Sequence, residues 1–230
     1  MQNTKSETLL KLADSIRGLE YTPLADKLHL YISSGIKDLD ESLPGGGLPA
    51  GSLIEVLAGE AAGSFSFCLM LARKAISAKP AWAVVDPGGC FYPPAAQQYD
   101  ISKLILTRPP ARHATWAFTQ LLGCPDVSAS FLTTASLNAD LDNMSYRRLQ
   151  LAAEHGQGLG FVMRPKEAAR KPCWAALRLL FERGENGGGE VTLLHVRGGR
   201  SGARLKQQGI GFRVQGLGDG MRQPSLTPEP

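Results

Sequence analysis

The residues most able to do chemistry lie in one short run, LIEVLAGEAAGSFSF at positions 53–67, which has the outline of a phosphate-binding loop. Such a loop reads G-x-x-x-x-G-K-[ST]: its backbone N–H groups hold phosphates, its lysine reaches the outer phosphates, and its hydroxyl binds Mg²⁺. Here Ala58 takes the first glycine position, Ser64 the lysine position and Phe65 the hydroxyl position. Gly59 and Gly63 still let the backbone approach an anion. We therefore interpret the run as a vestigial phosphate loop whose scaffold is kept and whose chemistry is lost.

Few other residues are placed for catalysis or metal binding. Asp86 ends an apolar run, where a catalytic acid would stand at a strand end, but an acid there more often caps the following turn. We expect that structural role. The histidines have no metal-binding spacing and the cysteines form no C-x-x-C pair; they are His29, His113, His155 and His195, and Cys68, Cys90, Cys124 and Cys173. We expect no enzymatic activity, no cofactor and no metal.

The composition is that of a soluble, cytoplasmic globular protein. The 230 residues are 43% apolar and 20% charged, enough for one sizeable domain. No stretch approaches the ~20 uncharged apolar residues of a membrane span, and the charged N-terminus lacks the apolar core of a signal peptide. Scattered thiols fit buried, reduced cysteines better than a disulfide framework.

The charge is distributed unevenly along the chain. Residues 1–163 carry a net charge of −2, whereas residues 164–213 hold 11 basic and 4 acidic residues, a net charge of +7. Two segments, RPKEAARK and RGGRSGARLK, suit contact with the phosphates of DNA or with a protein partner. A solvated basic rim explains the same pattern. The candidate contact residues are Arg164, Lys166, Arg170, Lys171, Arg197, Arg200, Arg204 and Lys206.

Strands and helices alternate between residues 52 and 164, which predicts an α/β fold with a parallel sheet covered by helices on both faces. The expected strands are 52–57, 81–86, 103–109, 127–134 and 159–165, and the expected helices are 64–77, 111–123 and 142–156, with a short one near 93–101.

Beyond Pro165 the pattern changes. The runs 173–183 and 190–199 flank a glycine-rich loop, GENGGG, and predict an antiparallel C-terminal extension of the sheet. Residues 6–20 predict an amphipathic helix. We therefore expect an N-terminal helix and linker (1–25), one domain (26–217) and a polar, proline-rich, disordered tail (218–230).

These elements resemble the RecA family, and some resemble the ImuA family of RecA-related proteins more closely. ISSGIKDLDESLPGGGLPAGSLIEVLAGEAAG resembles the RecA run that ends in the phosphate loop, and SYRRLQLAAEHGQGLGFVMRP and PCWAALRLLFE resemble ImuA. The resemblance covers about 28–200. It implies a RecA-like core in which the water-activating glutamate position falls at Gly88 and the Mg²⁺ aspartate position at Leu132, Thr133 or Thr134. All three parts of a phosphoryl-transfer site are then absent.

The resemblance also implies a role. ImuA-type proteins are accessory factors of bacterial error-prone translesion DNA synthesis, part of the SOS response to DNA damage. The implied partners are ImuB and an error-prone DnaE-type polymerase subunit, with RecA and single-stranded DNA as further candidates. The helix at 6–20 could mimic the segment by which one RecA subunit grips the next. Two alternatives remain open: a SulA-like inhibitor of the cell-division GTPase FtsZ, and an atypical nucleotide-binding enzyme.

Overall fold

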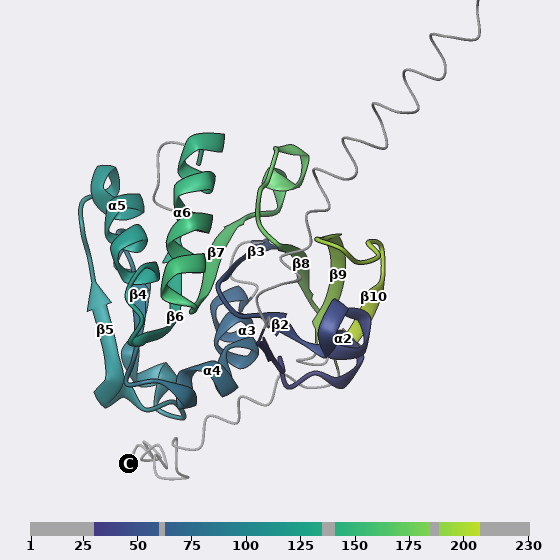
Figure 1. Ribbon diagram of the computed structural model, residues 1–230, viewed down its shortest axis with the longest axis horizontal. Coiled ribbons are helices and arrows are strands. Elements are labelled where there is room, and N and C mark those ends of the chain that lie inside the picture. The colour runs from purple at the N-terminus through teal and green to yellow at the C-terminus, as the bar shows by residue number, and fades with distance from the viewer. Residues whose placement is uncertain (1–29, 60–62, 135–140, 185–188, 208–230) are drawn as a thin grey trace, which may run out of the picture.

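The core of the protein is an eight-stranded mixed sheet with the order β10-β9-β8-β3-β7-β6-β4-β5 (Figure 1). The computed structural model describes residues 30–59, 63–134, 141–184 and 189–207. The strands of the main sheet are β3 (Ser52–Ala58), β4 (Ala81–Val85), β5 (Leu104–Thr107), β6 (Val127–Thr133), β7 (Leu159–Pro165), β8 (Leu177–Arg183), β9 (Gly189–Val196) and β10 (Arg204–Gln207).

The central strands are parallel, as predicted. β3 pairs in parallel with both β7 and β8, β6 joins β7 to β4, and β5 forms the far edge. Every residue of β3 is buried, because a central parallel strand is covered on both faces and needs apolar side chains on both. The one charged residue of this strand, Glu55, is fully buried as well.

Helices cover the two faces of the sheet in separate layers. On one face, α3 (Ser64–Leu71) and α4 (Arg73–Ala78) bury their apolar residues in the larger core cluster. On the other face, α5 (Ala111–Leu122) and α6 (Asn143–Gly156) pack against each other and enclose a second cluster (Figure 1). The predicted α/β architecture with helices on both faces is confirmed.

The predicted C-terminal extension is also confirmed, with one strand more than expected. β8 and β9 form an antiparallel hairpin, and β10 then pairs antiparallel with β9. The end of the basic segment RGGRSGARLK forms this added strand, because Arg204–Lys206 lie opposite Thr192–Glu190 in a regular ladder.

Three further details differ from the sequence expectations. The predicted helix at 64–77 is divided into α3 and α4 at Ala72. The short helix near 93–101 is two 3₁₀ turns, η2 (Pro93–Ala96) and η3 (Ile101–Lys103). Among the four cysteines, which we expected to be buried, only Cys68 is; Cys90 is exposed, and Cys124 and Cys173 are partly exposed.

A small unit before β3 was not predicted in detail. It consists of β1 (Tyr31–Ile32), α2 (Lys37–Ser42), η1 (Pro44–Gly46) and β2 (Leu48–Pro49), with β1 and β2 paired antiparallel. Leu39 and Leu48 of this unit are fully buried in the larger core cluster. The predicted helix at 6–20, the boundary near 25 and the tail at 218–230 lie outside the described residues.

Within the described ranges, no helix is long and apolar enough to cross a membrane.

Candidate functional site

A cavity of about 940 Å³ opens at the carboxyl ends of β3, β6 and β7. In open α/β sheets this edge is where ligands bind, outside the ends of the parallel strands. The cavity is lined by the vestigial loop residues Gly59, Ser64 and Phe65, and by Tyr92 and Lys166. It therefore marks the place where a working phosphate loop would hold its nucleotide.

The described ends of the loop, residues 58–59 and 63–65, lack the side chains that phosphoryl transfer requires. Gly63 has φ +79° and immediately precedes α3, so a left-handed residue leads into the helix. The ring of Phe65 packs against Phe91, with ring centroids 4.8 Å apart, and against Phe131 at 5.5 Å. The side chain in the Mg²⁺-ligand position thus belongs to an aromatic cluster and offers a metal no oxygen.

Asp86 caps the turn after β4, as the sequence analysis expects. It is fully buried, and its carboxylate accepts the backbone N–H groups of Cys90 at 3.0 Å and Phe91 at 2.9 Å. The Nε of Arg108 lies 3.4 Å from the same carboxylate. Gly88, in the position that the resemblance gives to a water-activating glutamate, is an exposed residue of this turn. The one acid at this strand end is therefore committed to holding a loop.

The three residues that could take the Mg²⁺-aspartate position at the end of β6 also have structural contacts. Leu132 is buried in the core cluster beneath α5 and α6. The hydroxyl of Thr133 donates to Asp86 at 3.4 Å, and that of Thr134 donates to the carbonyl of Met163 at 2.7 Å. Within the described ranges, no group of three or more His, Cys, Asp or Glu side chains could hold a metal ion.

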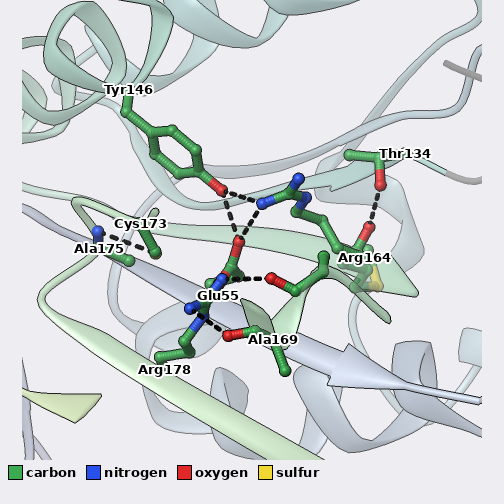
Figure 2. Close-up of polar contacts among 10 residues, drawn as sticks. Glu55, Thr134, Tyr146, Arg164, Ala169, Cys173, Ala175 and Arg178 are labelled. Carbon is green, nitrogen blue, oxygen red and sulfur yellow. Dashed lines mark hydrogen bonds and ion pairs between the residues drawn. The ribbon is translucent and has the colours of Figure 1, made fainter. Parts of the chain in front are cut away.

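A buried polar cluster lies under the crossover between β7 and β8, and sequence reasoning missed it (Figure 2). Oε1 of Glu55 accepts the hydroxyl of Tyr146 at 2.5 Å and Nη1 of Arg164 at 2.8 Å. Oε2 accepts Nε of Arg178. The remaining nitrogens of Arg178 donate to the carbonyls of Ala168 at 2.8 Å and Ala169 at 3.1 Å.

Charge and burial oppose each other at this carboxylate. Burial alone would raise the pKa of Glu55, but the hydrogen bond from Tyr146 and the guanidinium groups of Arg164 and Arg178 lower it below its usual value. Burial and the neighbouring carboxylate raise the pKa of the Cys173 thiol to about 12. Glu55 is therefore a carboxylate that holds two arginines in place, and Cys173 stays a neutral thiol at neutral pH.

This cluster positions one of the predicted basic segments. Arg178 binds the backbone of η4 (Lys166–Arg170), the short turn that follows β7. Lys166, Arg170 and Lys171 are exposed on and after this turn. Arg164 differs from them, because it is only 6% exposed and its guanidinium is bound to Glu55. Arg164 therefore belongs to the interior cluster and not to an exposed basic surface.

In the described part of the chain, only one residue of the second basic segment, RGGRSGARLK, is joined by a contact to the region of the first segment, RPKEAARK. Arg197 follows β9, and its Nη2 donates to the carbonyl of Trp174 at 3.1 Å, which joins it to the crossover that carries Lys171. Arg204 and Lys206 are exposed on β10, at the edge of the sheet. Arg200 is exposed in the turn between β9 and β10.

Two signals in the sequence could have revealed the missed residues. Glu55 stands alone in the apolar run LIEVL, and a charge in a buried strand must find a partner. Arg178 occupies the same kind of position in ALRLLF. The sequence cannot show that these two meet, because 123 residues separate them.

Comparison with known proteins supports the fold. No family model and no curated protein matches the sequence. Among solved structures, the chain is similar to the RadB recombinase, with 18% sequence identity and a TM-score of 0.58 over 76% of this chain and 94% of that chain. At this identity the likeness shows a shared fold, and the domain has the RecA-like α/β fold that the sequence analysis expects.

Proposed function

We propose that this protein is a non-catalytic, RecA-like accessory factor of damage-induced, error-prone translesion DNA synthesis. The observation that carries the proposal is the state of the nucleotide position. On a RecA-like fold, the lysine and magnesium positions hold Ser64 and Phe65, and Phe65 is packed into an aromatic cluster. A domain that retains this fold without the groups for phosphoryl transfer is suited to act by binding partners.

The resemblance to the ImuA family supplies the partners of this proposal: ImuB, an error-prone DnaE-type polymerase subunit, RecA and single-stranded DNA. The motif that carries this resemblance most specifically includes Arg147 and Arg148, and both are exposed on α6. The basic residues on and after η4 add a second exposed, positively charged surface. These are the surfaces that we assign to partners.

A SulA-like inhibitor of FtsZ is the alternative from another class. It would use the same fold and would need no nucleotide. The excess of basic residues between 164 and 213 favours the DNA-synthesis role, because blocking a tubulin-like polymer requires no polycationic segment.

Regulation of RecA is a specific form of the proposed function. The amphipathic segment 6–20 could occupy the contact by which RecA subunits grip one another. This form predicts that purified protein perturbs RecA filament assembly and strand exchange at stoichiometric excess. Unchanged filaments and unchanged strand exchange at that excess would rule it out.

The decisive experiment is affinity capture of the tagged protein from DNA-damaged bacterial cells, followed by pairwise binding of each purified candidate. We expect a translesion polymerase subunit or RecA to bind directly. The charge reversals Arg170→Glu and Lys171→Glu should weaken that binding. The control reversals Arg73→Glu and Lys74→Glu should not, because these exposed residues lie on α4, on the other face of the sheet. Direct binding of FtsZ without any polymerase subunit would contradict the proposal.

A further inference from the structure

Trp174 is an exposed aromatic residue that is held in place from two sides. Its side chain is 51% exposed, yet its indole Nε1 donates to Oδ1 of Asn143, the first residue of α6, at 3.1 Å. Its carbonyl accepts Nη2 of Arg197 at 3.1 Å, and the backbone N–H of Arg197 donates to the carbonyl of Ala176 at 2.8 Å. The ring is thus fixed in orientation while much of its surface faces solvent.

Three exposed cations lie on the segments that hold Trp174. Arg197 follows β9, Lys171 precedes the ring by three residues, and both are exposed. Arg147 is exposed one helical turn after Asn143, so it lies on the side of α6 that anchors the indole. The nearest acid in sequence to Asn143 is Asp142, whose carboxylate caps α6 by accepting the N–H of Ser145 at 2.7 Å.

The geometry points to a ligand that offers a flat ring and negative charge. The indole N–H is already bound to Asn143, so the ring has no donor left for a peptide carbonyl, while half of the residue stays exposed. Nucleic-acid bases stack on exposed aromatic rings in any sequence, and arginines beside them bind the phosphates. Bases of a duplex are stacked on each other, so a single strand is the form that fits.

We propose that Trp174 is a stacking platform for a base of single-stranded DNA, with Arg197 and Arg147 binding the flanking phosphates. This inference rests on the proposed function, which names single-stranded DNA as a partner. It adds Trp174, Asn143 and Arg147, none of which belongs to the predicted contact set. The platform is pre-organised, because the ring is ordered before any strand binds.

The test is fluorescence anisotropy of a labelled (dT)₂₀ oligonucleotide titrated with the full-length protein at low salt. Trp174→Ala should weaken binding on the order of tenfold, since stacking on an aromatic residue contributes that much per base. Trp174→Phe should retain most of the affinity. Trp116→Ala is the matched control, because Trp116 is 65% exposed on α5, and it should bind as the wild type does. Arg197→Ala should weaken binding and reduce its salt dependence.

Three outcomes would overturn the inference. The first is a wild-type protein that does not bind (dT)₂₀ at low salt. The second is a Trp174→Ala variant that binds (dT)₂₀ as tightly as the wild type does. The third is an equal loss of affinity for heparin, a polyanion without bases, which would assign Trp174 to local structure. The partner experiment separates the two proposals. A Trp174→Ala variant that binds a polymerase subunit and also keeps normal DNA binding refutes only the stacking platform. A wild-type protein that binds neither a polymerase subunit nor RecA refutes the proposed function.

Discussion

The carboxylate of Glu55 on β3 binds the guanidinium of Arg178 on β8 in the interior of the protein, although 123 residues separate the two in the chain. Through its other two nitrogens, Arg178 fixes the backbone of η4 at Ala168 and Ala169. Glu55 therefore helps, through Arg178, to position the turn that carries the exposed cations Lys166 and Arg170. The strand that leads into the vestigial phosphate loop also supports a candidate binding surface.

Replacing Glu55 should be strongly destabilising. Glu55→Gln leaves two buried arginines without their anionic partner, and breaking a buried ion pair in this way costs about 3–5 kcal/mol. The measurement is the free energy of unfolding from urea denaturation. Glu41→Gln is the control, because the Lys37–Glu41 pair is 3.7 Å apart and exposed, and its loss should cost less than about 0.5 kcal/mol. Equal, small effects of both variants would show that the buried cluster contributes no stability.

The same carboxylate should make stability depend on acid. The pKa of Glu55 is lower in the folded protein than its ordinary value of 4.5, so the ionised form favours the folded state. Its contribution is fully present above pH 4.5 and is lost as the pH falls through the folded-state pKa. Unfolding measured between pH 7 and pH 3 should therefore show a steeper loss of stability in the wild type than in Glu55→Gln. Parallel curves for the two proteins would contradict this assignment.

Asp86 should stabilise the turn after β4, so its replacement should lower the stability of the protein. In Asp86→Asn, an amide group would replace one carboxylate oxygen, and a donor would then face the N–H of Cys90 or of Phe91. A buried donor left unsatisfied costs about 1–3 kcal/mol. Asp126→Asn at an exposed position should leave the melting temperature unchanged. A normal melting temperature for Asp86→Asn would mean that the turn holds without its cap.

The contact between α5 and α6 depends on a glycine. A Cβ added at Gly156 would lie 2.0 Å from the carbonyl oxygen of Leu122, so Gly156→Ala must push the two helices apart. Such overpacking costs about 1–3 kcal/mol. Gly123→Ala is the matched control, because its Cβ would meet its nearest atom at an ordinary 3.5 Å. Thermal unfolding should show a lower midpoint for Gly156→Ala alone, and equal midpoints would contradict the packing.

The order of the strands and helices along the chain could be predicted from the sequence, because apolar strands of four to seven residues alternate with helices. The strand β10 could not be predicted, since a four-residue edge strand of mixed polarity has no pattern of its own and forms only against β9. Arg164 shows the same limit for sites. Its position near the end of an apolar strand resembles that of a surface cation, and only the tertiary contact with Glu55 makes it an interior residue.

Titration of the purified protein with ATP, with and without Mg²⁺, by calorimetry tests most directly whether this RecA-like fold has lost its nucleotide chemistry. With Ser64 in the lysine position and Phe65 in the Mg²⁺ position, we predict no micromolar binding, no effect of Mg²⁺ and no release of phosphate. Micromolar, Mg²⁺-dependent binding of ATP would contradict the vestigial phosphate loop and would favour an atypical nucleotide-binding enzyme.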